Sequence, residues 1–173
     1  MQNFFRFALI FFCTAMLALP TAARAAGPDV YFGYSRLGSN VFRANVPALN
    51  GWQAEANFSF VPLIGIDGDV AHYGLGAAST LPHTTTYMIG PRLTVGAHGI
   101  HVYGHGLFGG EHSSNSGGLF SSNAFTVAAG GGVDYHLISV LAARFNIDYI
   151  DAPTVTPSTA SHYRWGIGLA ARF

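Results

Sequence analysis

The chain has 173 residues, of which 9% are charged and 14% aromatic, and it contains 22 glycines. A soluble domain carries about 25% charged residues, so this composition indicates a surface that largely avoids water. The basic residues are all arginine and are matched by equally many acids, which excludes the basic footprint of a nucleic-acid-binding protein. No cofactor-binding pattern is present, and we expect no cofactor.

The first 25 residues have the pattern of a secretory signal peptide. Arg6 precedes an apolar run over Phe7–Leu19, and Ala23-Arg24-Ala25 forms a small-x-small cleavage site. The apolar run is shorter than the roughly 20 residues that a membrane-spanning helix needs. We therefore expect cleavage near Ala25 and a single mature domain over residues 26–173.

The expected mature domain contains alternating segments instead of a long apolar run. Without a spanning helix, only a closed barrel satisfies the backbone hydrogen bonds of a chain in lipid. Successive strand residues face opposite sides, so each segment would present an apolar outer face and a polar or small inner face. The pattern predicts an all-β fold, an eight-stranded antiparallel up-and-down transmembrane β-barrel. The eight predicted strands are Asp29–Arg36, Gly51–Val61, Ile64–Tyr73, Thr84–Gly96, Ile100–Gly110, Asn123–Tyr135, Ile138–Ile150 and His162–Phe173.

The connections between these segments alternate in length. Short turns are predicted around Pro62, at Ala97–Gly99 and at His136–Leu137. The long polar loops are 37–50, 74–83, 111–122 and 151–161, and they are the candidate sites for surface ligands. Short turns on one side and long loops on the other are typical of outer-membrane barrels, where the short turns are periplasmic.

The closing segment has aromatic residues on its predicted outer face. Tyr163, Trp165 and Phe173 lie on that face, while Arg164 and Arg172 lie on the other. A terminal strand of this kind resembles the signal that the barrel-assembly machinery reads in outer-membrane proteins. Other outward aromatics are predicted to form two girdles, Trp52, Tyr87, Phe125 and Tyr149 at the loop end and Phe58, Phe60 and Tyr135 at the turn end.

Several motifs together resemble one family. Gly51-Trp52-Gln53-Ala54, Gly90-Pro91-Arg92, Gly130-Gly131-Gly132-Val133-Asp134 and the closing strand are similar to the small eight-stranded outer-membrane β-barrel proteins, the OmpA-type or porin-family barrel domain. The resemblance spans the mature chain. It implies location in the outer membrane of a Gram-negative bacterium, contact with outer-membrane lipid, and a structural or surface-interaction role. We expect no peptidoglycan-binding domain after the barrel.

The predicted lumen is rich in charge. An eight-stranded barrel is just wide enough for side chains to fill it, and buried charges cost several kcal/mol each unless they are paired. A polar plug of arginine–carboxylate pairs is the first interpretation, and a narrow gated pore in which these pairs exchange partners is the second. The inward charged residues are Glu55, Asp67, Asp69, Arg92, Asp134, Arg144, Asp148, Arg164 and Arg172.

The histidines do not predict a metal site. His101 and His105 share a face with Tyr103 inside the barrel, opposite Val102 and Phe108, but four residues along a strand separate the two by about 13 Å. The spacing is too long for both to bind one ion. The remaining candidates, His72, His83, His112 and His162, lie toward the loop side, where we interpret them as solvated polar positions.

An enzymatic alternative rests on His112-Ser113-Ser114-Asn115. This stretch resembles the His-x-Ser-Asn motif of outer-membrane lipid A deacylases, in which His112 and Ser114 would serve as base and nucleophile. It lies in a predicted Gly/Ser-rich loop, where Ser and Asn also occur for turn formation alone. The following strand offers no clear acid at that height.

A second alternative is a soluble binding barrel of lipocalin type. This fold requires the apolar face of each strand to line an internal pocket and the charged face to meet water. The transmembrane barrel and the lipocalin-type barrel therefore differ in one observable, namely whether the apolar residues point outward or inward.

Overall fold

The computed structural model describes residues 27–38, 48–61, 63–74, 83–114, 121–151 and 161–173. The expected signal peptide lies outside these residues. Within them the chain forms eight strands, and no helix is long and apolar enough to cross a membrane. The strands are β1 (Asp29–Gly38), β2 (Ala48–Val61), β3 (Ile64–Tyr73), β4 (His83–Ala97), β5 (Ile100–Ser114), β6 (Ser121–Ile138), β7 (Leu141–Asp151) and β8 (Ser161–Arg172).

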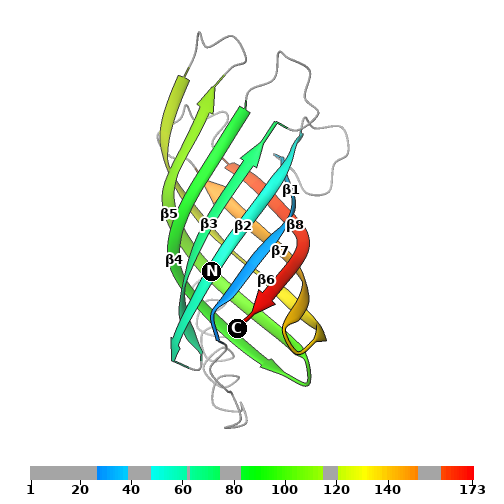
Figure 1. Ribbon diagram of the computed structural model, residues 1–173. Helices are drawn as coiled ribbons and strands as arrows, with labels where there is room; N and C mark the ends of the chain where they lie inside the picture. The colour runs from blue at the N-terminus through cyan, green and yellow to red at the C-terminus, as the bar shows by residue number, and fades with distance from the viewer. Residues whose placement is uncertain (1–26, 39–47, 62, 75–82, 115–120, 152–160) are drawn as a thin grey trace, which may run out of the picture.

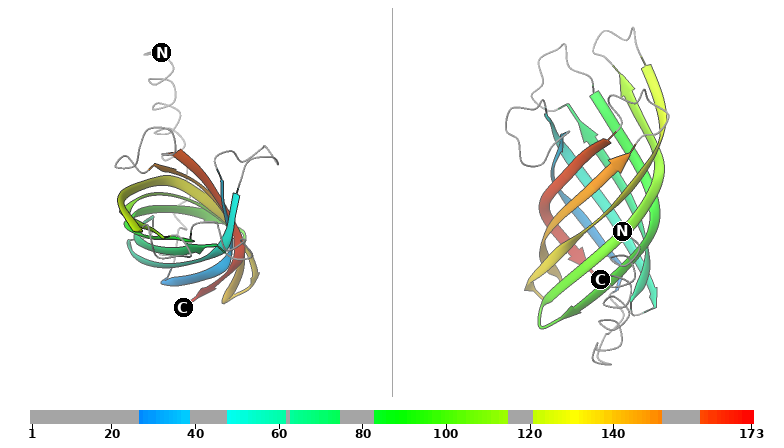
Figure 2. Two further views of the ribbon diagram at one scale, coloured as in Figure 1. Left: turned by 90° about the horizontal axis from the view of Figure 1, so that it is seen from above. Right: turned by 180° about the vertical axis from the view of Figure 1, so that it is seen from behind.

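The eight strands close into one antiparallel barrel in sequence order. Each strand pairs with the next, and β8 pairs with β1 from Arg172 opposite Asp29 to Tyr163 opposite Gly38. The strands are strongly tilted and curve around a single interior (Figures 1 and 2). The predicted fold, including its strand number and topology, is confirmed.

Alternation fixes the orientation of every strand. In β3, Ile66 and Val70 are exposed on the outer wall, whereas Asp67 and Asp69 between them are buried. β5 has the predicted faces, with Val102 exposed on the wall and its neighbours Tyr103 and His105 buried. Exposed Phe, Ile, Val and Tyr side chains cover the outside, and buried Asp, Glu and Arg fill the inside. This is the reverse of a water-soluble barrel, so the lipocalin-type alternative is wrong.

Two of the three short turns lie as the sequence predicts. β2 ends at Val61 and β3 begins at Ile64, and these two residues pair. Between β4 and β5 the turn is His98-Gly99, and both residues have positive φ, 53° and 84°. Two consecutive positive φ values are the geometry that matches the twist of a tight hairpin, which explains the glycine at its second position.

The third turn corrects a prediction. β6 continues through Ile138, and the turn before β7 is Ser139-Val140, not His136–Leu137. A register shift between His136 and Ile138 exposes both Leu137 and Ile138, so the alternation that the prediction relied on fails here. A β-bulge of this kind adds one residue to a strand and leaves no simple sequence pattern.

The strands also extend further toward the loops than predicted. β5 includes Glu111–Ser114 and β6 begins at Ser121, and the two pair up to Ser114 opposite Ser121. Residues at the predicted loop edges of 37–50, 74–83 and 151–161 likewise belong to strands. The extensions of β5 and β6 are polar, so they carry no apolar alternation, although their backbones continue the ladder of hydrogen bonds.

Candidate functional site in the barrel interior

The structure places all nine predicted inward charges inside the barrel. Eight of them are at most 2% exposed, and the Arg172 side chain is 10% exposed. Asp29 joins them, so six of the eight acids and four of the eight arginines of the chain lie in one interior network. Burial on this scale is tolerated where every charge has partners of opposite sign.

Arg144 on β7 is the hub on the turn side of this network. Its Nε and Nη2 donate to the two carboxylate oxygens of Asp134 at 2.7 and 2.9 Å, a bidentate pair. Nη1 donates to Glu55 at 2.8 Å, and Nη2 also donates to Asp29 at 2.7 Å. Arg172 donates to Asp134 as well, at 2.7 Å. One guanidinium therefore ties β7 to β1, β2 and β6, and such charge-assisted hydrogen bonds are the strong ones.

A second hub lies closer to the loop end. Arg164 on β8 donates from Nε to Asp148 at 2.8 Å and from Nη1 to Asp69 at 2.7 Å. The side-chain amide of Gln53 links the two hubs, because it donates to both Asp69 at 2.7 Å and Glu55 at 2.8 Å. Strands that are distant in sequence are thereby connected across the lumen.

His105 occupies the centre between two carboxylates. Its Nδ1 lies 2.8 Å from Asp67 on β3, and its Nε2 lies 2.9 Å from Asp148 on β7. A neutral imidazole carries one N–H donor, whereas an imidazolium carries two. Because carboxylate oxygens face both nitrogens, the geometry fits the doubly protonated ring, which supplies a fifth cation to the network.

Arg92 is held differently from the other buried arginines. Its Nη1 lies 3.6 to 3.9 Å from Asp67, Asp29 and Glu55, and its guanidinium carbon lies 3.6 Å above the centre of the Tyr103 ring. Among the described residues, neither Nη1 nor Nη2 has a hydrogen-bond partner. Its Nε donates to the Thr94 hydroxyl at 3.3 Å, so one hydrogen bond to a neutral group, ion pairs longer than a hydrogen bond and a cation–π contact hold this guanidinium in place.

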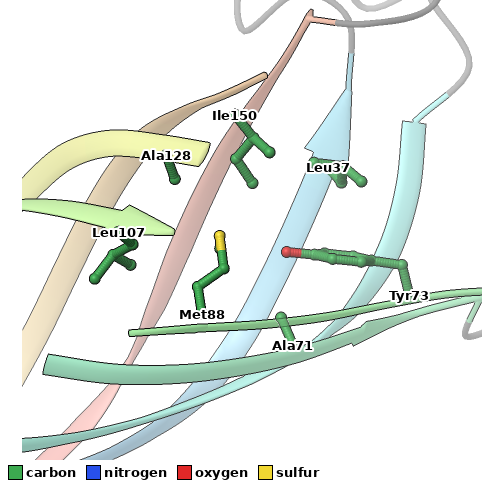
Figure 3. Packing of buried hydrophobic residues seen from close by; sticks show 7 residues of the cluster. All are labelled: Leu37, Ala71, Tyr73, Met88, Leu107, Ala128 and Ile150. Atoms are coloured by element: carbon green, nitrogen blue, oxygen red, sulfur yellow. The ribbon is translucent and has the colours of Figure 1, made fainter. Parts of the chain in front are cut away.

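An apolar layer lies in the lumen on the loop side of the ionic network. The side chains of Tyr73, Met88 and Ile150 point toward one another across the interior (Figure 3). The Tyr73 hydroxyl contacts Ser35 Oγ at 3.3 Å. The complete layer consists of Leu37, Ala71, Tyr73, Met88, Leu107, Ala128 and Ile150. Packed hydrocarbon thus adjoins the ionic network on its loop side.

Glycines on the inner face make room for the network. A Cβ at Gly166 would collide with Asn146 Oδ1 and come within 2.8 Å of Gln53 Oε1. A Cβ at Gly132 would lie 2.7 Å from the Tyr103 hydroxyl. In a barrel of eight strands the interior is narrow, so large side chains on one strand need glycine on the facing strands.

At the turn-side end the lumen carries two stacked histidines. The rings of His101 and His136 lie 4.7 Å apart at an interplanar angle of 26°. The sequence places His101 and His105 on one face. The two side chains do not share a binding site, because both ring nitrogens of His105 contact the two aspartates described above. Among the described residues, no group of three or more His, Cys, Asp or Glu is arranged to hold a metal ion.

The candidate deacylase residues lie on strand β5 and not in the predicted loop. Nδ1 of His112 contacts Asn123 Oδ1 at 2.7 Å on the outer wall. The adjacent acid, Glu111, alternates to the lumen side, where it accepts a hydrogen bond from Ser113 at 3.0 Å. In a catalytic triad, a carboxylate contacts Nδ1 of the histidine. Here the amide of Asn123 occupies that position on His112, and this geometry does not favour the deacylase hypothesis.

The three residues of the expected assembly signal all face outward. Tyr163 is 40% and Phe173 is 81% exposed. Trp165 packs against Tyr34 of β1 with ring centres 5.6 Å apart, and Tyr163 packs against Tyr149 of β7 at 5.4 Å. The closing strand thus joins an aromatic girdle on both sides, and its role in assembly stays a prediction.

Sequence reasoning missed two members of the network. Asp29 was assigned only as the start of a strand, although Val30 and Phe32 face outward and the alternation therefore turns Asp29 inward. His105 was expected inside the barrel but without partners. The partners come from β3 and β7, 38 and 43 residues away, and no local pattern reports such distances.

Comparisons with known proteins agree with this architecture. No protein-family model matches the chain, and no curated protein matches its sequence. Solved structures do match over 87% of this chain. Neisserial surface protein A superposes with a TM-score of 0.70 at 13% identity over 99% of that chain. OprG from Pseudomonas aeruginosa gives 0.59 at 12% identity over 97%, and Ail of Yersinia pestis gives 0.58 at 17% identity over 100%. The chain has the fold of the small outer-membrane β-barrels. Identities this low establish the fold alone.

Proposed function

We propose that the protein is an outer-membrane barrel whose filled lumen makes it a rigid, non-conducting scaffold with a structural or surface-interaction role. The observation that carries this proposal is the occupied interior, in which an ionic network lies beneath a packed apolar layer. The outward apolar wall supports insertion in lipid, and the residues 1–25 support export with cleavage near Ala25. The barrel-assembly machinery is the expected partner during insertion.

The surface-interaction part of the proposal concerns the four loop segments 37–50, 74–83, 111–122 and 151–161. Buried ion pairs connect the strands that carry these segments, so the strands form a rigid support for the loops. The names of two structurally similar proteins support this part: one is Neisserial surface protein A, and the other is the attachment invasion locus protein of Yersinia pestis.

Cell fractionation combined with protease shaving tests location and topology together. We expect the protein in the detergent-extracted outer-membrane fraction, with heat-modifiable migration on gels and cleavage confined to the four loop segments. Release of the protein by osmotic shock, with all of its strands protease-sensitive, would contradict the proposal.

Planar-bilayer recording separates the closed scaffold from the gated pore. We expect no stable conductance from the wild-type barrel, and we expect Arg92→Ala to lower stability instead of opening a channel, because the apolar layer remains in place. A large and steady wild-type current would favour the pore.

The deacylase alternative is tested by lipid-deacylation assays with wild type and Ser114→Ala, where we expect no activity from either.

A further inference from the structure

The two contacts of the His105 ring need two protons. Nδ1 lies 2.8 Å from Asp67 Oδ2 and Nε2 lies 2.9 Å from Asp148 Oδ1, so each contact joins a nitrogen to an oxygen at hydrogen-bond distance. A neutral imidazole beside two carboxylates supplies one proton, and its second nitrogen would then turn a lone pair toward an anionic oxygen. The geometry therefore requires one proton more. We call Asp67, His105 and Asp148 the Asp–His–Asp unit.

The second proton belongs on the ring. A free imidazole is more basic than a free aspartate carboxylate by about 2.6 pKa units. Asp148 also accepts from a guanidinium, because Nε and Nη2 of Arg164 lie 2.8 and 2.6 Å from its Oδ2. Such charge-assisted hydrogen bonds are strongest to an ionised carboxylate. The unit is thus an imidazolium between two carboxylates.

The charges around the unit are better balanced with this proton than without it. Arg92 lies opposite His105 in the β4–β5 register, and its Nη1 is 3.6 Å from Asp67 Oδ2. The Tyr103 ring meets the His105 ring edge-on at 5.6 Å, and Gly130 is opposite His105 on β6. The other charged or titratable side chains that face this part of the lumen are Asp29 and Tyr31 on β1, Glu55 on β2, Asp69 and Tyr73 on β3, Asp134 on β6, Arg144 on β7, and Arg164 and Arg172 on β8. Six acids and four arginines leave an excess of two negative charges in the network, and the imidazolium lowers that excess to one.

The unit connects strands that are not neighbours in the barrel. Asp67 lies on β3 and Asp148 on β7, and His105 on β5 reaches both. Among the described residues Asp67 Oδ1 has no hydrogen-bond partner, whereas Asp148 also binds Arg164, so an imidazole with one N–H keeps its contact with Asp67. We propose that the unit is a buried proton-binding site that locks β3 to β7 through β5, and that loss of its second proton at alkaline pH releases the contact with Asp148. This inference rests on the proposed rigid scaffold and makes its rigidity depend on a proton.

The composition of the chain makes this proton countable. The sequence contains no lysine, and its one cysteine lies in the expected signal peptide. In the expected mature domain, histidine and the terminal amine are therefore the groups whose ordinary pKa lies between about 5 and 9. An unfolded histidine loses its proton near about pH 6.5, so above that pH the folded state binds one proton more than the unfolded state. The stability that the unit contributes is fully present at lower pH and is lost as the pH rises.

Nitrogen NMR of the wild-type protein observes the proton directly. The protein is labelled with isotope-enriched histidine, folded in detergent micelles and checked by heat-modifiable migration. An imidazolium has two protonated ring nitrogens, whereas a neutral imidazole has one protonated and one bare nitrogen with a different chemical shift. We expect the His105 signal, assigned by its loss in His105→Gln, to be that of an imidazolium at about pH 8, where a free imidazole is neutral.

Two aspartates on one face of β3 provide a matched pair of variants. Asp67→Asn replaces the carboxylate at Nδ1 by an amide, and we expect the pH at which His105 loses its second proton to fall by about one unit or more. Asp69→Asn is the control, because Asp69 binds Arg164 and Gln53 instead. We expect His105 to remain an imidazolium at about pH 8 in this control.

Urea titration counts the same proton through stability. For one proton bound by the folded state alone, the unfolding equilibrium constant rises about tenfold for each pH unit. We expect this slope between about pH 7 and pH 8 in the wild type and its loss in His105→Gln. His112→Gln on the outer wall is the control and should keep the wild-type slope.

The outcomes distinguish the proton site from the proposed function. A chain that never shows heat-modifiable migration contradicts the outer-membrane barrel itself. A folded wild type in which His105 is neutral at about pH 8, or whose unfolding constant stays the same from about pH 7 to pH 8, overturns the proton site and leaves the barrel standing. Equal behaviour of Asp67→Asn and Asp69→Asn has the same meaning. If His105→Gln does not fold, the wild-type titration and the two aspartate variants decide the question.

Discussion

The lumen contains two layers that are filled on different principles. The ionic layer around Arg144 and Arg164 depends on pairs of groups at hydrogen-bond distance, many of them on strands that are not neighbours. The apolar layer around Met88 and Ile150 depends on volume. Removing one partner from the first leaves a buried charge unpaired, whereas trimming the second leaves a small cavity. The two layers should therefore differ in how much a single substitution costs.

The largest effect is expected from Arg144→Ala. It leaves Glu55 and Asp29 without their shortest cationic contacts and Asp134 without its bidentate pair, and breaking a buried ion pair costs about 3–5 kcal/mol. The free energy of unfolding is measured by urea titration in detergent micelles, followed by tryptophan fluorescence. Arg36→Ala, on the outer wall at the loop end, is the control. Equal losses from both arginines would mean that the network does not determine stability.

The apolar layer provides the matched comparison. Ile150→Ala removes buried methyl groups from a residue that is 2% exposed, and we expect a loss of about 2–4 kcal/mol in the same titration. Met88→Leu nearly conserves volume and should cost less than about 1.5 kcal/mol. A larger loss for Met88→Leu than for Ile150→Ala would show that shape, and not volume, determines this layer.

The requirement for glycine on the inner face is tested by the substitution Gly166→Val. The added side chain meets Asn146 Oδ1 and Gln53 Oε1, so it must displace two members of the network, and overpacking costs about 1–3 kcal/mol. Gly106→Val on the outer wall meets nothing within 4 Å and serves as the control in the same urea titration. We expect the control to retain the wild-type midpoint. Equal urea midpoints for Gly166→Val and Gly106→Val would show that the space around Gly166 on the inner face does not limit stability.

The smallest effect is expected on the lipid-facing wall. Ile66→Leu changes the shape of a side chain that is 46% exposed and meets no network residue, and we expect a change within about 0.5 kcal/mol. The measurement is again the unfolding free energy, compared with Ile150→Ala inside the barrel. A wall substitution as costly as the interior one would remove the distinction between the two surfaces.

Much of the architecture could be predicted because period-two alternation is a local property. Trp52 and Phe58 facing outward and Glu55 facing inward follow from position along a strand, as does the interior placement of Arg92. The turn at His136–Leu137 was misplaced because a bulge breaks that alternation. The end of β5 was placed too early and the start of β6 too late, because the polar residues there have no apolar period to follow.

The sequence by itself determined which residues face lipid and which face the lumen, because that choice repeats every second residue and needs no knowledge of other strands. Only the tertiary structure decided the partners. His105 between Asp67 and Asp148, or the neighbouring positions of His72 and His112 on the outer wall, depend on strand register and on closure of β8 against β1. Register is set by the whole barrel at once, so the contacts that it creates cannot be read from any one segment.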